Sequence, residues 1–340
     1  MKNIRFLLVI IMTGMAVFLS SCATQTEESS REIHENILAA HVKIVHKDTL
    51  EKTESGLYYT VLRQGSGAAT TDSSMVFVKE TIRDLNYNLQ GSTEEDVARQ
   101  LGMFSYQDAY IPLFWYMGQY SIMMGLEEML QQMREGEARR IWLPYWLSAY
   151  AEGGTSENSV TMVYDLELVK VVDDIVRYEI DTLEAFRDKY YPGLDSLENG
   201  FYKMTLIPGT GDSLEHATTV SAYYIGKFLN GHVFDTNVAD TALKYSIYSS
   251  SNSYSELKVT LPDKEEEGDD TETTEEGSVV EGFSKCMLNM RYGEIAICFF
   301  NSDYGYTYEG STATSTGSYL GGGIPAYMPL FFWIYVPLEE

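Results

Sequence analysis

The sequence predicts an α+β fold, in which an antiparallel sheet packs against one helix, and it predicts this fold twice. The stretch ESGLYYTVLRQGSG at 54–67 has an echo, ENGFYKMTLIPGTG, at 198–211, which is 144 residues later. Each copy contains several short runs with the alternation of strands and one run with helical spacing. A repeat of this size indicates tandem domains, and strands with a single helix indicate a sheet covered on one face.

The first copy, residues 54–174, is expected to contain four strands and one helix. An opening strand leads through a Gly-x-Gly turn into an alternating strand, and a variable region follows. The strands are expected at 57–62, 75–81, 138–143 and 160–172. Apolar residues at helical spacing mark the helix, and they are Ile122, Leu126, Met129 and Met133. Gly136 lies where the C-terminal cap of that helix is expected.

The second copy, residues 196–340, repeats this order with one longer loop. Its strands are expected at 201–207, 219–225, 295–300 and 329–336, and its helix carries Val280, Phe283, Met287 and Met290. Gly293 takes the position of the helix cap. The helix of this copy and the strand that follows it lie 157 residues after their counterparts, whereas the earlier strands lie 144 residues after theirs. This copy has therefore gained a net 13 residues between them. The acidic run 263–277 is the candidate insert, and it is expected to be a solvated loop.

The first 22 residues have the features of a bacterial lipoprotein signal peptide. Lys2 and Arg5 precede an apolar run at 6–19, which is shorter than the ~20 residues that span a bilayer. The run ends in Leu-Ser-Ser-Cys, which resembles a lipobox and marks Cys22 as the lipidated residue. The alternatives are a plain secretory signal and an N-terminal anchor helix. A tether or stalk is expected at 23–53, and a connecting helix is expected at 175–195, where the stretch 181–191 is predicted to be helical.

Composition limits the classes of function. The net charge of −26 argues against a nucleic-acid partner, because phosphate binding needs clusters of Lys and Arg. No metal-binding or hydrolytic motif such as HExxH, CxxC or GxSxG is present, and no cofactor is expected. The 26 tyrosines suit a β-rich protein with an aromatic site. Cys286 and Cys298 are expected to be buried free thiols, with a disulfide as the alternative.

The segment 220–237 is the richest in side chains that could build a pocket. Its alternation predicts a half-buried strand, Gly226 interrupts the pattern, and Asn230-Gly231 is a dipeptide typical of hairpin turns. Beyond the turn, the dipeptide at 234–235 places an aromatic ring next to a carboxylate. The question that this segment raises is what the pocket would hold.

The second copy resembles the FKBP-type peptidyl-prolyl isomerases. In that family a bent antiparallel sheet wraps around one short helix, and aromatic residues line the groove between them. The matching motifs occur in the family's order, at 224–226 (YIG), 230–235 (NGHVFD), 279–283 (VVEGF), 303–306 (DYGY), 323–325 (GIP) and 330–332 (LFF). One departure is Phe283, which replaces the family's Trp. The resemblance covers residues 196–338.

The resemblance implies a role for eight residues of the second copy. Walls and floor of the groove are assigned to Tyr224, Phe234, Phe283 and Phe332, although each could alone be an ordinary core residue. Groups that face the substrate are Asp235, the backbone N–H of Val280, the hydroxyl of Tyr306, and Ile324 at the lip. Asp235 has an alternative as a turn carboxylate that accepts a nearby backbone N–H.

The first copy keeps the scaffold and loses the pocket residues. At the spacing of 144, Tyr224 corresponds to Glu80, Phe234 to Gln90 and Asp235 to Gly91. This copy is therefore expected to be a degenerate domain with a structural or protein-binding role.

The sequence thus predicts a peptidyl-prolyl isomerase that is anchored by lipid in the bacterial cell envelope, with the outer membrane favoured. Its substrates would be proline-containing polypeptides that fold in the envelope or are secreted. Rotation about an X-Pro bond needs no nucleophile, because a dry aromatic site favours the twisted, less dipolar amide. The alternative is a catalytically inactive, membrane-tethered chaperone that binds extended segments.

Overall fold

The computed structural model describes residues 29–118, 121–150, 160–263, 279–311 and 323–338. The chain divides into two compact units, Met1–Thr49 and Leu50–Glu340. Cys22 and the rest of the expected signal peptide lie outside the described residues, and so does most of the acidic run. None of the described helices combines the length and apolar character that a membrane span requires.

The first unit contains helix α2 (Ser30–His46), which lies in the segment expected to be a tether. The hydroxyl of Ser29 accepts the backbone N–H of Glu32 and caps the N-terminus, and Lys47 ends the helix in a left-handed conformation. The last residues of the expected tether belong to the second unit, because strand β1 (Glu51–Lys52) pairs with strand β2 (Tyr58–Arg63).

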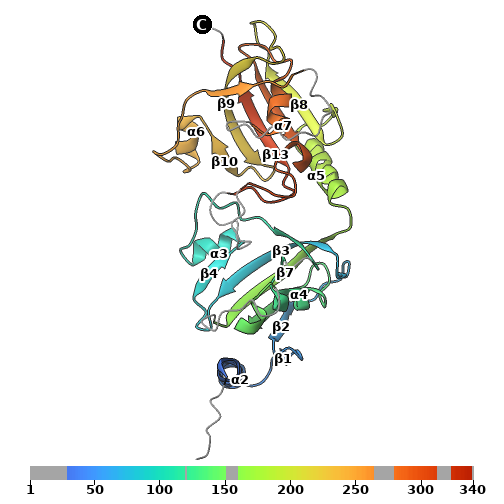
Figure 1. The fold of residues 1–340 in the computed structure, drawn as a ribbon, viewed down its shortest axis with the longest axis vertical. Coiled ribbons are helices and arrows are strands. Elements are labelled where there is room, and N and C mark those ends of the chain that lie inside the picture. The colour runs from blue at the N-terminus through green and yellow to red at the C-terminus, as the bar shows by residue number, and fades with distance from the viewer. Residues whose placement is uncertain (1–28, 119–120, 151–159, 264–278, 312–322, 339–340) are drawn as a thin grey trace, which may run out of the picture. The chain divides into compact units, whose positions relative to one another are not determined.

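The second unit contains two antiparallel sheets, one in each copy of the repeat (Figure 1). The N-terminal sheet has the strand order β1-β2-β6-β7-β3-β4, and β5 pairs with the free part of β3. Its strands are β1 (Glu51–Lys52), β2 (Tyr58–Arg63), β3 (Met75–Arg83), β4 (Leu89–Ser92), β5 (Leu113–Tyr116), β6 (Ala138–Leu143) and β7 (Met162–Val172).

The C-terminal sheet has the order β10-β9-β13-β12-β8, and β11 pairs with β9. Its strands are β8 (Phe201–Ile207), β9 (Thr219–Phe228), β10 (Val233–Thr236), β11 (Leu257–Thr260), β12 (Ile295–Phe300) and β13 (Leu330–Tyr335). Helices α4 (Met124–Leu130) and α7 (Glu281–Met287) bury their apolar sides in the cores of the two copies. The predicted α+β architecture is confirmed in both copies.

Strand pairing places the two copies in register. Ile82 pairs with Tyr164 and Gly91, as Gly226 pairs with Phe332 and Asp235. The spacing of 144 residues holds as far as β5 and β11, whereas α4 and α7 are 157 residues apart. The 13 extra residues of the second copy therefore lie between β11 and α7, where the acidic run was expected to account for them.

Two details of the sequence prediction are wrong. The variable region contains a short helix in each copy, α3 (Glu95–Gln100) and α6 (Ala239–Lys244), and two strands beyond the four expected, β4 and β5 in the first copy and β10 and β11 in the second. Gly136 and Gly293 do not cap α4 and α7, which end at Leu130 and Met287. Both glycines have positive φ and lie in the turn before the next strand, where their N–H groups donate to the carbonyls of Leu168 and Val336.

The connecting helix is longer than the sequence predicted. Helix α5 (Ile175–Tyr190) begins six residues before the expected start at 181, because the side chain of Asp174 accepts the N–H of Arg177 and caps it. Leu183 of α5 is fully buried with Phe299 and Phe331 of the C-terminal sheet. The ring of Phe186 lies 5.2 Å from that of Phe299, edge to face. Helix α5 therefore covers the outer face of the C-terminal sheet.

Candidate functional site

The candidate site is built on the hairpin of β9 and β10. Gly231 has a φ of +92°, its N–H donates to the carbonyl of Phe228, and the side chain of Asn230 accepts the N–H of His232. These bonds form the predicted tight turn. Beyond it, the register shifts between Val233 and Asp235, so Phe234 is the bulged residue of β10. A bulge turns a side chain away from the regular alternation, and here it brings Phe234 to the face that carries the other rings.

Gly226 leaves room for two of those rings. A Cβ atom at this position would lie 2.6 Å from Cζ of Phe234 and 3.0 Å from Cε1 of Phe332. The centroids of these two rings are 5.8 Å apart, at an angle of 89°. The glycine that interrupts the strand pattern is therefore required by the close approach of Phe234 and Phe332.

Four rings expected in the groove form one continuous cluster. Phe283 packs edge to face on Phe332 at 5.2 Å and on Tyr224 at 5.6 Å. Phe283 and Phe332 are buried, whereas Tyr224 and Phe234 are only half-buried. Such edge-to-face pairs fix ring orientation as well as burying area. The cluster thus has a buried floor and a partly exposed edge.

Asp235 is exposed and belongs to the edge of this cluster. Its Oδ2 accepts the hydroxyl of Tyr224 at 2.6 Å, and its Oδ1 accepts the backbone N–H of Thr236 at 2.8 Å. The carboxylate therefore combines the turn contact with a contact to the ring cluster. Burial and the charge of Asp235 raise the pKa of Tyr224, so the phenol remains protonated and continues to donate.

The remaining predicted site residues belong to the same core of the C-terminal copy, which includes Phe283 and Phe332. Tyr306 and Val280 are half-buried and pack against this core, and Ile324 is buried in it. Burial, followed by the charge of Asp235, raises the pKa of Tyr306, which keeps its hydroxyl as a donor near that carboxylate. Val280 precedes α7, and no described residue accepts a hydrogen bond from its backbone N–H. The structure thus brings all eight residues together; their catalytic roles stay predictions.

Sequence reasoning missed two residues that fix Tyr224. The side chain of Asn237 accepts the N–H of Tyr224 at 2.8 Å and donates to the carbonyls of Ala222 and Ser255. The hydroxyl of Thr236 donates to the carbonyl of Tyr224. At the spacing of 144, Asn237 corresponds to Thr93 and Thr236 corresponds to Ser92. Polar side chains at both positions in both copies were the sequence signal that could have indicated these contacts.

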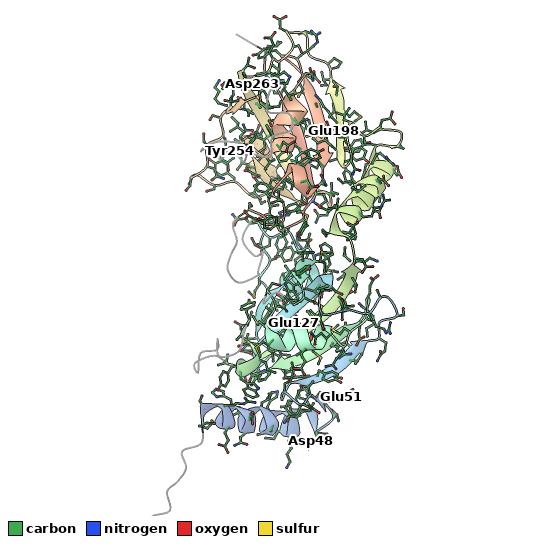
Figure 2. The ribbon with its side chains drawn as sticks, turned by 45° about the vertical axis from the view of Figure 1, so that its right-hand side comes forward. Asp48, Glu51, Glu127, Glu198, Tyr254 and Asp263 are labelled. Carbon is green, nitrogen blue, oxygen red and sulfur yellow. The ribbon has the colours of Figure 1, made fainter. Side chains whose placement is uncertain are left out.

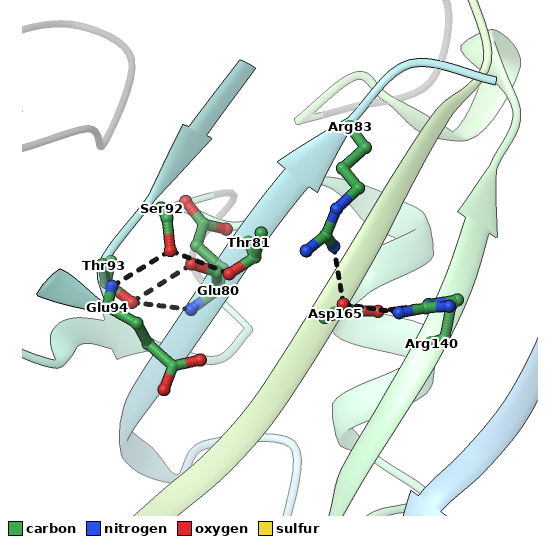
Figure 3. Close-up of polar contacts among 8 residues, drawn as sticks. All are labelled: Glu80, Thr81, Arg83, Ser92, Thr93, Glu94, Arg140 and Asp165. Atoms are coloured by element: carbon green, nitrogen blue, oxygen red, sulfur yellow. Dashed lines mark hydrogen bonds and ion pairs between the residues drawn. The ribbon is translucent and has the colours of Figure 1, made fainter. Parts of the chain in front are cut away.

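The same place in the N-terminal copy has different chemistry (Figure 3). The hydroxyl of Thr93 accepts the N–H of Glu80 at 2.8 Å, which repeats the contact of Asn237 with Tyr224. Glu80 is 8% exposed, and burial raises its pKa to about 7. Ile82 and Gln90 occupy the positions of Gly226 and Phe234, so a branched side chain is present where the other copy leaves room for a ring.

Cys286 and Cys298 are both free and buried, as expected. The thiol of Cys298 donates to the carbonyl of Gly282, and both cysteines lie in the core that supports Phe283 and Phe332. Burial raises the pKa of the Cys298 thiol. Protonated, shielded thiols are poor nucleophiles, so these cysteines have the character of core residues.

No protein-family model and no curated protein sequence matches the chain. Solved structures do match its fold. The three FKBP domains of wheat FKBP73 are 16% identical over 85% of this chain and 98% of that chain, with a TM-score of 0.27. A peptidyl-prolyl cis-trans isomerase of Pseudomonas syringae pv. tomato is 20% identical over 49% of this chain and 96% of that chain, with a TM-score of 0.32.

Escherichia coli FkpA is 20% identical over 48% of this chain and 71% of that chain, with a TM-score of 0.31. All the TM-scores are below 0.5, so the function proposed below rests on the residues of the site.

Proposed function

We propose that the protein is a peptidyl-prolyl cis-trans isomerase whose active site is the ring cluster of the C-terminal copy. The observation that carries the proposal is the half-buried edge formed by Tyr224, Phe234 and Tyr306 beside the carboxylate of Asp235. A proline ring fits against such an apolar edge, and the adjoining donors suit the carbonyl groups of an extended polypeptide.

The chemistry requires no acid–base pair. The barrier to rotation about the X-Pro bond is ~18–20 kcal/mol because the amide resonance must be broken. Phe283 and Phe332 provide a surface without water, which favours the less dipolar twisted amide. The Tyr306 hydroxyl and the Val280 N–H are fixed donors that can stabilise the twisted state more than either planar state.

The substrates would be proline-containing polypeptides outside the cytoplasm. This part of the proposal rests on the signal-like segment at 1–22 and on the lipobox-like residues before Cys22. A lipid chain at Cys22 would attach the protein to a membrane of the bacterial envelope by burying its methylene groups. Labelling with a radioactive fatty acid in a bacterial host, with Cys22→Ser as the control, tests this part.

The activity is tested with the full chain that follows Cys22. Isomerisation of an Xaa-Pro peptide series is measured in a protease-coupled assay. We expect Phe234→Ala to lower kcat/KM at least ~10-fold, which corresponds to about 1.4 kcal/mol of lost transition-state stabilisation. Gln90→Ala, at the corresponding position of the N-terminal copy, is the control and should leave kcat/KM unchanged. A full chain that gives only the uncatalysed rate contradicts the proposal.

For the N-terminal copy we propose a role without catalysis. The observation is that Ile82, Gln90 and Gly91 replace the glycine, the ring and the carboxylate of the C-terminal site. Suppression of aggregation of an unfolded client by Phe234→Ala protein tests this role. Suppression equal to that of the unmodified protein supports binding by the N-terminal copy, and its loss contradicts it.

A further inference from the structure

A buried carboxylate of the connecting helix contacts the loop that carries Tyr306. Glu179 of α5 is 1% exposed, and its two oxygens accept hydrogen bonds from a single residue, Ser302. The donors are the backbone N–H of Ser302, at 2.9 Å, and its hydroxyl, at 2.8 Å. Ser302 is equally buried, so both hydrogen bonds are shielded from water, where they are strongest.

Ser302 in turn fixes the backbone on both sides of Tyr306. Its carbonyl accepts the N–H of Gly305 at 2.8 Å and the N–H of Thr307 at 3.0 Å. Tyr306 is the residue between these two donors. A contact that holds Ser302 therefore also determines where the Tyr306 side chain leaves the loop.

The other ionisable groups that face Glu179 do not neutralise it. Asp303 approaches from the same loop, and Tyr327 approaches from the segment before β13. No described lysine or arginine forms an ion pair with this carboxylate. Burial raises the pKa of Glu179 to about 7, and the two bonds from Ser302 act in the opposite direction. Among the described residues, Ser302 is therefore the one hydrogen-bond partner of the Glu179 side chain.

We infer that Glu179 is a positioning residue for the proposed isomerase site, which holds the Tyr306 hydroxyl in place through Ser302. The inference rests on the proposed function of the C-terminal copy. It adds a residue from outside the expected domain at 196–340 and makes α5 a functional part of that domain. The side chain of Glu179 itself would not touch the substrate.

The N-terminal copy shows the turn without this contact. At the spacing of 157 residues, Tyr145 corresponds to Ser302 and Ala149 corresponds to Tyr306. The turn bond is kept, since the N–H of Ser148 donates to the carbonyl of Tyr145 as that of Gly305 donates to Ser302. Among the described residues, the buried Glu–Ser contact is therefore found in the copy that has the tyrosine to position.

The first test is a double-mutant cycle for isomerase activity, performed with the full chain after Cys22. Glu179→Ala should lower kcat/KM ~10-fold. In a Tyr306→Phe background, the same change should lower it less than twofold, because the group that it positions has been removed. Glu179→Gln keeps an acceptor for the Ser302 N–H and should retain most of the activity. Asp181→Asn, an exposed carboxylate of the same helix, is the matched control. If the loss of kcat/KM in the double variant equals the product of the losses in the two single variants, the two residues act independently and the inference is overturned.

The second test does not depend on activity. Hydrogen exchange of the full chain should show that Glu179→Ala accelerates exchange of the amides of Ser302, Gly305 and Thr307 ~10-fold, whereas Asp181→Asn does not. Unchanged exchange overturns the inference even if the protein is an isomerase. Faster exchange with unchanged kcat/KM overturns it as well. If the protein has no isomerase activity, the proposed function fails, and exchange alone decides whether the contact exists. Should Glu179→Ala fail to fold, Ser302→Ala removes the hydroxyl contact and enters the same cycle.

Discussion

At the scale of single residues, Gly226 separates the two copies most clearly. Its lack of a side chain lets Phe234 and Phe332 meet, whereas Ile82 occupies the same position of the N-terminal sheet. The sequence showed this glycine as a break in strand alternation. It could not show which side chains needed the space, because the two rings come from strands that are far apart in the chain.

Gly226→Ala is predicted to destabilise the protein and to displace the rings. The added Cβ would lie 2.6 Å from Phe234, and overpacking of this kind costs about 1–3 kcal/mol. Urea denaturation measures the loss, and kcat/KM should fall with it. Ser221→Ala, on the same strand and half-buried, is the control and should change the free energy of unfolding by less than about 0.5 kcal/mol. Equal stability of the two variants would contradict the role given to Gly226.

Glu80 gives the N-terminal copy a dependence on pH. Burial raises its pKa from an ordinary value of 4.5 to about 7, so the folded state binds the proton more tightly than the unfolded state. The contribution of protonated Glu80 to the free energy of unfolding is fully present below pH 4.5 and is lost as the pH rises through about 7. Burying this carboxylate in its charged form is therefore a cost that appears near neutral pH.

Glu80→Gln should remove this cost. We predict that the difference in the free energy of unfolding between the variant and the unmodified protein shifts in favour of the variant by on the order of 2 kcal/mol from pH 5 to pH 8. Guanidinium denaturation at both pH values measures the difference. Glu94→Gln, which changes a half-buried carboxylate close in sequence, is the comparison variant at both pH values. A gain that is the same at both pH values would contradict the assignment.

At the scale of elements, local patterns predicted the strands well and the variable region poorly. The strands at 138–143, 201–207 and 295–300 match the prediction residue for residue, because each combines alternation or an apolar run with clear ends. The segments 95–110 and 239–254 share one structure but only four identical residues, among them Tyr110 and Tyr254. Each of these tyrosines accepts a backbone N–H from the residue five positions earlier. Tyr254 is labelled in Figure 2. Comparison at the spacing of 144 would have revealed this repeat.

The outer faces of the two sheets explain why α5 packs on each of them in a different way. In the N-terminal sheet, Asp165 of β7 pairs with Arg83 and Arg140, so this part of the face is polar (Figure 3). Elsewhere on this sheet, Phe77 packs with Ile175 and Tyr178, which lie in the first turn of α5. The corresponding position of the C-terminal sheet is Trp333, which packs with the cluster beneath α5. An apolar face needs a cover, and the amphipathic α5 provides it.

Leu183→Ala is predicted to destabilise the C-terminal sheet. Leu183 is fully buried between α5 and the sheet, and truncation of a buried leucine costs about 2–5 kcal/mol. Thermal denaturation measures the loss, and hydrogen exchange should locate it in β12 and β13. Lys189→Ala, an exposed change in the same helix, should leave the melting temperature within about 2 °C. A loss confined to α2 or the N-terminal sheet would contradict the packing described.

At the scale of the whole molecule, the chain contains one scaffold twice, and the two copies carry different chemistry. The internal repeat predicted the fold of both copies, because strand spacing preserves register between them, whereas the eight site residues were assigned from the family resemblance and their roles stay predictions. It did not predict Glu179, since the expected helix began at 181 and the cap at Asp174 went unnoticed. The boundaries at 54, 174 and 196 stay predictions.

The acidic run is predicted to be dispensable for the scaffold. The N-terminal copy joins β5 to α4 without the 13 additional residues of the second copy. Removing residues 265–277, for which the sequence predicts a solvated loop, should therefore leave the melting temperature within about 3 °C, because the closure entropy of a loop changes little with its length. Circular dichroism on heating measures this effect. Loss of cooperative unfolding in the shortened protein would show that the run contributes to the fold.

The position of α5 has a consequence for how the protein could be divided into fragments that each contain one copy. The C-terminal copy is not a module that begins at its first strand, because a fragment from 196 onward would expose Tyr202, Phe299 and Phe331 to water. A cut ahead of Asp174, where the chain is exposed, keeps α5 with the C-terminal sheet but removes Ile175 and Tyr178 from Phe77 of the N-terminal sheet. The helix that links the two copies in sequence therefore also belongs to both in its packing, because its start covers Phe77 and its later turns cover Phe299 and Phe331.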